Sequence, residues 1–209
     1  NSGPGFGGSC FKKDILNLVY LAKFFDLHEV AKFWEAVVNL NDWHQHRLSK
    51  LIIQKLFGTI SGKKISIFGF SFKANTNDTR ESAAIRICKD LLEEGAFISI
   101  NDPKVTDKQI EKDLGKRSIK NNINYSQKLD FFDLEGEWIF ESNVYKSAEN
   151  SDAVVILTEW EEYSKINWKT ISKKMRKPSW IFDARSILNP KEIVDNDLLL
   201  WRIGDGSCK

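Results

Sequence analysis

The sequence contains few cysteines and no long apolar segment. Its 209 residues include 3 cysteines, at positions 10, 88 and 208, and no two of them have Cys-x-x-Cys spacing. A sparse, odd set of cysteines fits a reducing compartment better than a disulfide framework, so we expect a cytoplasmic location. No apolar run reaches membrane-spanning length and no signal peptide is visible, so we expect no membrane association.

The sequence also lacks a strong excess of charge of either sign. Lysine and arginine together number 31 and aspartate and glutamate 29, which leaves a formal net charge of +2. This balance requires no basic face, so nucleic acid is not the expected partner. The 3 histidines show no metal-ligand spacing, and we expect no metal site. The chain begins at Asn1 rather than at methionine, and we expect it to be a fragment of a longer protein.

Two helical segments are expected before the first strand. The first runs from Cys10 to about Phe25, with Ser9 as its N-cap. The second runs over residues 28–57, where apolar side chains recur at intervals of three and four until Gly58 ends the pattern. At 1.5 Å per residue this helix is roughly 45 Å long.

The long helix over residues 28–57 carries more apolar surface than one small domain needs. Trp34 and Trp43 suit the role of interface anchors, because large aromatic side chains dominate protein interfaces. We therefore expect a homo-oligomer formed through this helix.

Strand and helix patterns alternate after residue 60. Residues 64–70 and 97–100 favour strands and residues 79–95 favour a helix, a unit that predicts a parallel sheet with a right-handed crossover. Further along, strands are expected at 153–157, 180–182 and 198–203, a helix at 163–175, and a mobile polar excursion at 104–128. The fold class is therefore α/β: a helical segment, residues 1–59, precedes a Rossmann-like open parallel-sheet domain, residues 60–209.

A glycine-rich loop leads into the first helix through a cysteine. In Gly5-Phe6-Gly7-Gly8-Ser9-Cys10, the glycines let the backbone approach a ligand closely. Cys10 lies in the first helical turn, where the helix dipole and the nearby lysines favour the thiolate. Asp14 is four residues on and shares a face with Cys10, a pairing that suits covalent chemistry at a carbonyl. An ordinary glycine turn beside a half-buried cysteine would show the same spacing.

These residues carry a resemblance to a known family. Gly-Phe-Gly-Gly-Ser-Cys-Phe-x-Lys-Asp resembles the catalytic segment of the UDP-glucose dehydrogenases, in particular the eukaryotic members. The likeness continues in the same order through Glu29-Val30-Ala31, Asn41-Asp42, Gly69-Phe70-x-Phe72-Lys73, Asp78-Thr79-Arg80-Glu81-Ser82, Asp102-Pro103-Lys104-Val105, Thr158-Glu159-Trp160 and Phe182-Asp183-x-Arg185. It covers nearly the whole chain, and several separated motifs in one order are more specific than any single motif.

The resemblance implies an NAD-dependent oxidation of UDP-glucose to UDP-glucuronate in two steps. Cys10 would attack the intermediate aldehyde to give a thiohemiacetal, the second hydride transfer would give a thioester, and water would hydrolyse it. Asp14 would assist the water and proton steps. Holding the intermediate covalently explains the need for a thiol, since a free aldehyde could diffuse away between the two oxidations.

The resemblance also implies the binding residues. Gly3, Gly5, Phe6 and Gly7 of the loop, Phe72 and Lys73 after the first strand, and Arg185 after a later strand would contact the substrate, UDP-glucose. Lys73 could otherwise be a solvated lysine, and Arg185 could form only a surface salt bridge. Where this chain has Ala184 and Ser186, the family often has glycine and a second arginine.

Arg80 and Lys13 are the residues that the resemblance places at the NAD cofactor. Arg80 is expected at the first turn of the helix over residues 79–95, with Asp78 or Thr79 as its cap. A cation at a helix N-terminus opposes the dipole, and a bound anion would explain its presence. An ordinary exposed arginine is the alternative.

A complete enzyme also needs parts that the motifs above do not supply. No segment shows a Gly-x-Gly-x-x-Gly turn behind a first strand, and in the family the NAD domain, a general-base glutamate and an oxyanion-stabilising lysine precede the cysteine segment. We expect the chain alone to be inactive. Two alternatives stay open: a dehydrogenase of another nucleotide sugar, and a non-catalytic module for UDP-sugar binding or dimerisation. Phe11 and Asn41-Asp42 favour UDP-glucose, and Cys10 with Asp14 argues against the module.

Overall fold

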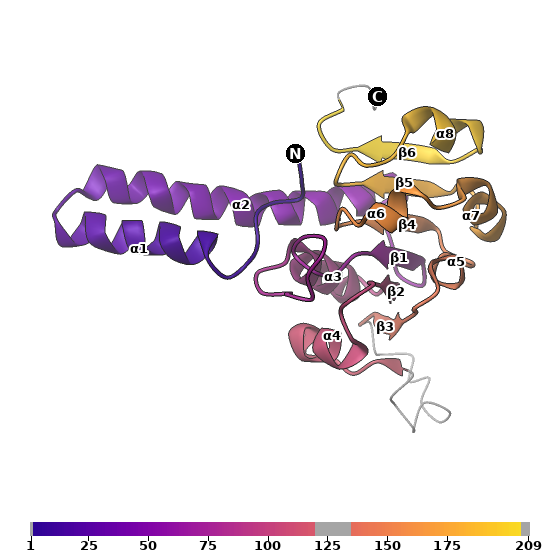
Figure 1. The fold of residues 1–209 in the computed structure, drawn as a ribbon, viewed down its shortest axis with the longest axis horizontal. Helices are drawn as coiled ribbons and strands as arrows, with labels where there is room; N and C mark the ends of the chain where they lie inside the picture. Colours follow the sequence, from indigo (N-terminus) through magenta and orange to yellow (C-terminus); the bar gives the residue numbers. More distant parts are fainter. Residues whose placement is uncertain (1, 120–134, 206–209) are drawn as a thin grey trace.

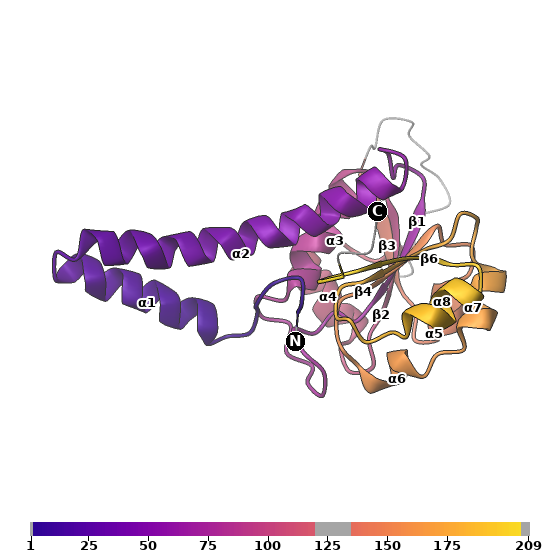
Figure 2. The same cartoon turned by 90° about the horizontal axis from the view of Figure 1, so that it is seen from above.

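A computed structural model describes residues 2–119 and 135–205. Figures 1 and 2 show a pair of helices, α1 (Phe11–Phe24) and α2 (His28–Lys55), reaching away from an α/β part that contains the other elements. The far end of α2 runs into the α/β part, where it lies beside α3 (Ala83–Glu93). The long helix predicted from the sequence is confirmed to within two residues at its C-terminal end.

A parallel sheet is the centre of the α/β part and has six strands within the described residues, in the order β3-β2-β1-β4-β5-β6. The strands are β1 (Lys64–Phe68), β2 (Phe97–Asn101), β3 (Glu137–Phe140), β4 (Ala153–Ile156), β5 (Trp180–Asp183) and β6 (Leu199–Arg202). The chain moves outward from β1 to β3 and then restarts at β4 on the other side of β1. In such doubly wound sheets, ligands bind beyond the carboxyl ends of the strands at this switch point.

Helices cover both faces of the sheet. On one face lie the end of α2, α3 and α4 (Asp107–Leu114), and on the other lie α5 (Val144–Ser147), α6 (Glu161–Ser164), α7 (Trp168–Lys174) and α8 (Pro190–Asp195). Because successive side chains of a strand point to opposite faces, Ile65 and Ile67 of β1 join the first cluster and Phe68 joins the second. The fold class predicted from the sequence is confirmed.

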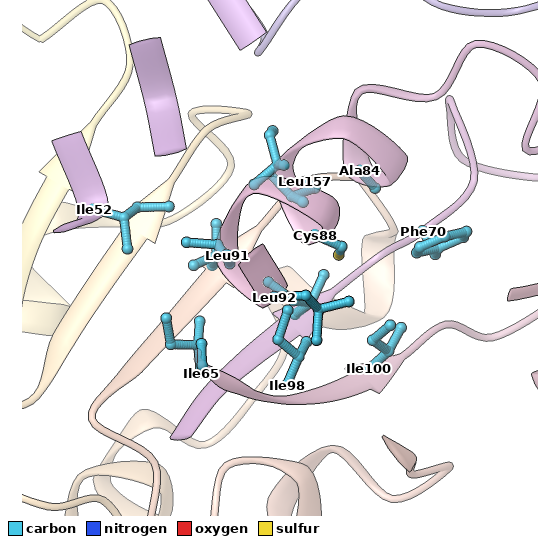
Figure 3. Close-up of a cluster of buried hydrophobic side chains, with 14 of the residues drawn as sticks. Ile52, Ile65, Phe70, Ala84, Cys88, Leu91, Leu92, Ile98, Ile100 and Leu157 are labelled. Atoms are coloured by element: carbon cyan, nitrogen blue, oxygen red, sulfur yellow. The ribbon is translucent and has the colours of Figure 1, made fainter. Parts of the chain in front are cut away.

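The core beneath α3 also includes the end of α2. Figure 3 shows Ile52 of α2 on the side of Leu91 of α3, with Cys88 further along that helix and Ile65 and Ile98 of the sheet below. Cys88 is 0% exposed, as expected for a core residue, and burial raises the pKa of its thiol. The long helix is therefore fixed to the α/β part by packing as well as by the chain.

Two helix starts differ from their predicted positions. Ser9 is not the N-cap of α1: the N-cap residue is Cys10, and its side chain makes no capping hydrogen bond. The helix expected from residue 79 begins at Ala83, where the Ser82 hydroxyl accepts a hydrogen bond from the amide of Ala84. Glu81 just before it has a φ of 53°, a left-handed conformation that a helix cannot include.

Other elements were missed or divided by the sequence patterns. Part of the expected excursion over residues 104–128 is helix α4, capped by Thr106 and ended by Gly115 with a φ of 70°; residues 120–128 lie outside the described part. The single helix expected over residues 163–175 is two short helices, α6 and α7, because the side chain of Asn167 caps a new start. Strand β3 was missed, since only Trp138 of its four residues is buried.

Candidate functional site

The glycine loop, residues 3–8, lies between α2 and the carboxyl ends of the strands. From α2, the Asn41 side chain accepts from the amide of Phe6 at 2.8 Å and donates to its carbonyl at 3.2 Å. One turn further along α2, the His44 ring nitrogen Nε2 lies 3.1 Å from the carbonyl oxygen of Gly3. The backbone of the loop is therefore held by side chains of α2.

The glycines of the loop are required by close contacts with protein. Gly7 lies against the residues after β1, where an added Cβ would come within 2.3 Å of the carbonyl oxygen of Glu81. Gly5 has a φ of 127°, and a Cβ there would meet Asn41 Oδ1 at 2.7 Å. The amide of Gly8 donates to the carbonyl of Arg80 at 2.9 Å. The glycines were expected to let the loop backbone approach a ligand closely. In this structure the loop backbone makes its close contacts with other residues of the chain.

Gly3, Gly5 and Gly8 also have the spacing of a dinucleotide-binding turn. That turn joins a strand to a helix and leaves its backbone open to a pyrophosphate. Here the described residues before α1 include no strand, and the glycines are occupied by the contacts above. The spacing therefore does not identify a cofactor site.

Cys10 and Asp14 begin helix α1 and are both exposed. The Cys10 sulfur lies 3.6 Å from the Ser9 hydroxyl, and the amide of Asp14 donates to the carbonyl of Cys10 at 2.8 Å, closing the first helical turn. The ring of Phe11 meets that of Phe6 edge to face, with centroids 4.7 Å apart. The thiol and the carboxylate thus share the start of one helix and are open to a ligand.

The two lysines after Cys10 differ in their surroundings. Lys12 Nζ lies 2.9 Å from Glu81 Oε2 and 3.7 Å from Asp42 Oδ1, so that two carboxylates offset its charge. The hydrogen bond that Lys12 donates to Glu81 is the largest cause that raises the pKa of Lys12. Lys13 is exposed and keeps its place in the first turn. Lys12 is therefore paired with carboxylates, and the expected effect of the two lysines on the thiol stays a prediction.

Arg80 lies before α3 rather than in its first turn, so the argument from the helix dipole is wrong. Its guanidinium is exposed and pairs with Asp78, with Nη2 at 2.7 Å from Oδ2. This hydrogen bond is the main cause that raises the pKa of Arg80, and the charge of Cys10 contributes in the same direction. Arg80 is thus an exposed arginine paired with Asp78 on the sheet side of the loop.

Phe72 and Lys73 follow β1 at the switch point. Phe72 is half-buried beneath the loop, where a Cβ on Gly8 would meet its ring carbon Cε2 at 2.9 Å. Lys73 is exposed, and its Nζ lies 5.3 Å from the centroid of the Phe72 ring. An apolar ring and an exposed cation are therefore presented together at the carboxyl end of the central strand.

Arg185 follows β5 and is mostly buried, with 15% of its side chain exposed. Its Nε donates to the carbonyl of Leu157 at 2.7 Å and lies 3.2 Å from Glu159, and its Nη2 donates to the carbonyl of Phe72 at 3.1 Å. Burial is the largest cause that lowers the pKa of Arg185. The alternative of a surface salt bridge is wrong, because this arginine joins the ends of three strands and touches Gly3 of the loop.

The structure brings most of the predicted substrate residues together. Gly3 meets Arg185, Gly7 meets Phe72, and Phe6 lies between α2 and Phe11. Lys13 and Asp14 share the first turn of α1 with the cysteine. The sequence analysis gave no role to His44 in holding the loop; a polar side chain one turn after Asn41 on the same helix face was the available signal.

Comparison with known proteins identifies the family of the chain. Residues 66–190 match the model of the UDP binding domain of the UDP-glucose/GDP-mannose dehydrogenase family, and residues 1–43 match the central domain of that family. The chain belongs to this family. It is 43% identical over 200 residues to UDP-glucose 6-dehydrogenase of Caenorhabditis elegans, and 44% identical over 189 residues to that of Drosophila melanogaster.

These alignments cover 96% and 90% of this chain but only 39% and 38% of the two relatives. The chain therefore spans about two-fifths of the length of the curated relatives it matches. Among solved structures, a UDP-glucose dehydrogenase from Pyrobaculum islandicum matches with a TM-score of 0.63 and 24% identity, over 88% of this chain and 35% of that one. At this identity the likeness supports the fold.

The described residues show neither a metal centre nor a membrane span. No group of three or more histidine, cysteine, aspartate or glutamate side chains among them could hold a metal ion. Within the same residues, no helix is both long and apolar enough to cross a bilayer.

We predict that Cys10 reacts with iodoacetamide at neutral pH at least about a hundredfold faster than Cys88 in the native protein. Cys10 is exposed, whereas Cys88 is buried and has a raised thiol pKa, so it reacts only when the core opens. Mass spectrometry of the tryptic peptides over time measures both rates. In guanidinium chloride the two cysteines should react at similar rates; equal rates in the native protein would contradict the prediction.

Proposed function

We propose that this chain is the part of an NAD-dependent UDP-glucose 6-dehydrogenase that carries the catalytic cysteine and the UDP-sugar site. The observation that carries the proposal is the packing of the Cys10 loop against Phe72 and Arg185 at the switch point of the sheet. The match to the UDP binding domain of the family and the identity to two UDP-glucose 6-dehydrogenases support it. Cys10 and a nucleotide would then meet at one edge of the sheet.

The substrate would bind through the loop and the strand ends. Lys73, an exposed cation at the carboxyl end of β1, suits a phosphate or a sugar hydroxyl. The apolar ring of Phe72 lies beside it, and Arg185, with its Nη2 on the carbonyl of Phe72, would hold that arrangement and contact the substrate. Gly3, Gly5, Phe6 and Gly7 would line the pocket with backbone.

Cys10 would serve as the nucleophile of the second oxidation. Loss of a hydride and a proton converts the C6 alcohol of UDP-glucose to an aldehyde. Cys10 Sγ then forms a bond to that carbon as the thiol proton passes to the aldehyde oxygen, which gives a thiohemiacetal. Loss of the second hydride from that carbon, with the hydroxyl proton, leaves a thioester on Cys10. Water attacks its carbonyl carbon, the C–S bond breaks, and the carboxylate and the thiol are released. Asp14, four residues from Cys10, would orient that water and accept its proton.

NAD would be the oxidant, accepting one hydride in each of the two steps. The residues of this chain that would meet it are Lys13 and Arg80, exposed cations close to the cysteine. Their charge fits a cofactor that carries two phosphates. A free catalytic thiol also suits the cytoplasm, which we propose as the location of the protein.

The chain would act as a homo-oligomer through the helical hairpin. The hairpin surface consists of the exposed apolar side chains Phe11, Leu16, Leu18, Tyr20, Leu21, Phe24, Phe25, Leu27, Val30, Phe33, Leu40 and Trp43. Trp43 is 56% exposed, whereas Trp34 packs against α1 and offers less surface to a partner. A set of large exposed apolar residues on two adjacent helices is typical of an interface.

The proposed roles of the hairpin and of the sheet divide the chain into two units, residues 1–59 and 60–209. The first would provide the interface and the cysteine, and the second would bind the UDP-sugar. Helix α2 serves both, because Ile52 lies in the core of the second unit.

We predict that the 209-residue chain binds UDP and that Lys73→Ala weakens the affinity about tenfold, the usual cost of losing a hydrogen bond to a charged group. Isothermal titration calorimetry measures the dissociation constant. The matched control is Lys169→Ala, which removes an exposed lysine of α7 on the far face of the sheet and should leave UDP affinity unchanged. Equal effects of the two substitutions would contradict the assignment of Lys73.

We predict that Cys10→Ser abolishes UDP-glucuronate formation while UDP-glucose still binds, because an alcohol cannot replace the thiol that carries the acyl group. The test uses a chimera in which this chain replaces the corresponding part of the Caenorhabditis elegans relative, with NADH and products measured together. The chain alone, in the same assay, should release no NADH above a Cys10→Ala control. Normal glucuronate production by the Cys10→Ser chimera would exclude the covalent route.

We predict that the chain sediments as a dimer at tens of micromolar and that Leu40→Glu shifts it toward the monomer, because a buried unpaired charge is costly at an interface. Leu40 is exposed on α2, seven residues from Phe33 and three from Trp43 on the same face. Val194→Glu, at an exposed apolar position of α8, is the control and should not change the sedimentation coefficient. A wild-type chain that is monomeric throughout this range would contradict the interface.

A further inference from the structure

The turn over residues 70–73 is held from the ends of the neighbouring strands. We propose that Asp102, which follows β2, is a positioning residue that fixes this turn and thereby places Phe72 and Lys73 in the nucleotide-sugar site. The ligand in this inference rests on the proposed function, whereas the hold on the turn rests on the contacts alone. Asp102 itself is 4% exposed and lies beneath the turn.

One oxygen of Asp102 accepts hydrogen bonds from the turn. Oδ2 lies 2.7 Å from the amide of Phe70 and 3.1 Å from the amide of Ser71, and the Ser71 hydroxyl is 3.3 Å away. The indole Nε1 of Trp160, beyond β4, donates to the same oxygen at 3.3 Å. Two consecutive backbone amides just before Phe72 are therefore fixed by one carboxylate oxygen.

The other oxygen of Asp102 is held by the loop after β2. Oδ1 accepts from the amides of Lys104 and Val105, both at 2.9 Å. The carboxylate therefore binds its own loop through Oδ1 and the turn after β1 through Oδ2. Because β1 and β2 are adjacent parallel strands, this contact passes directly between their carboxyl ends.

Two further strand ends close the turn from the other side. The hydroxyl of Thr158, 0% exposed after β4, donates to the carbonyl of Ser71 at 2.6 Å. Arg185 after β5 donates to the carbonyl of Phe72 at 3.1 Å. The amide, carbonyl and hydroxyl of Ser71 and the carbonyl of Phe72 are thus occupied, which leaves the side chains of Phe72 and Lys73 as the parts of the turn that face a ligand.

Asparagine cannot replace Asp102 in this arrangement. In every hydrogen bond that the structure shows for this side chain, the carboxylate oxygen is the acceptor, and this holds for Oδ1 and Oδ2 alike. The amide nitrogen of asparagine would therefore face backbone N–H groups in either orientation of the side chain. A buried donor without an acceptor is costly, so the turn should move or loosen.

The experiment compares Asp102→Asn with Asp152→Asn. Asp152 is also a mostly buried carboxylate, but it lies at the amino ends of the strands, where it accepts from the amide of Lys64 and from Arg176. Both substitutions should lower the melting temperature. Only Asp102→Asn should weaken UDP binding, by about tenfold or more, and speed the exchange of the Ser71 amide hydrogen as measured by NMR.

Thr158→Val provides a second variant that should fold, since valine has the shape of threonine without the hydroxyl. It should weaken UDP binding and speed exchange near Ser71, and Thr158→Ser, which restores the hydroxyl, should recover both. Unchanged UDP affinity and exchange in Asp102→Asn and Thr158→Val would overturn the positioning role. A wild-type chain that does not bind UDP would contradict the proposed function, and amide exchange would still decide whether Asp102 holds the turn.

Discussion

The candidate site depends on the contact between the backbone of Gly7 and the backbone of Glu81. A side chain at Gly7 would place its Cβ within 2.3 Å of the Glu81 carbonyl oxygen, so the loop reaches the strand ends only as glycine. The amide of Gly8 bonds to Arg80 at the same place. This contact brings Cys10, on the helical part, to the edge of the sheet where Phe72 and Arg185 lie. The left-handed backbone of Glu81 belongs to the same constraint, because it turns the chain from the loop contact into α3.

The cations at the site differ in their burial and in their partners. Arg185 is enclosed and donates to two backbone carbonyls, which makes it a structural tie between strand ends. Lys73 and Lys13 are exposed, and Arg80 is exposed but paired with Asp78. Lys12 differs from its neighbour Lys13 because it is paired with Glu81 and Asp42. Residue type alone could not show which of these cations are buried or paired and which are exposed.

The sequence allowed the fold class and the main site segments to be predicted, since they depend on local patterns. The apolar period of α2, the β-branched runs of β1 and β4, and the Gly-Gly-Ser-Cys loop are all readable in short windows. The misses have physical causes of longer range. Strand β3 lies at the edge of the described sheet and buries little, and the start of α3 is set by Ser82 after a left-handed Glu81. The buried pairing of Arg185 and the hold of Asp102 on the turn need strands far apart in sequence to meet.

Helix α2 has 28 residues and is held at unequal points along its length. Ile52 is embedded in the α/β core, Asn41 and His44 grip the glycine loop, and the end near His28 lies about 20 Å beyond Asn41 at the rise of an α-helix. The core thus fixes one end of the helix, and the glycine loop is attached between that fixed end and the end near His28. Any tilt of the helix about its anchored end would therefore move Asn41 and His44, and the glycine loop with them, by less than it moves the end near His28.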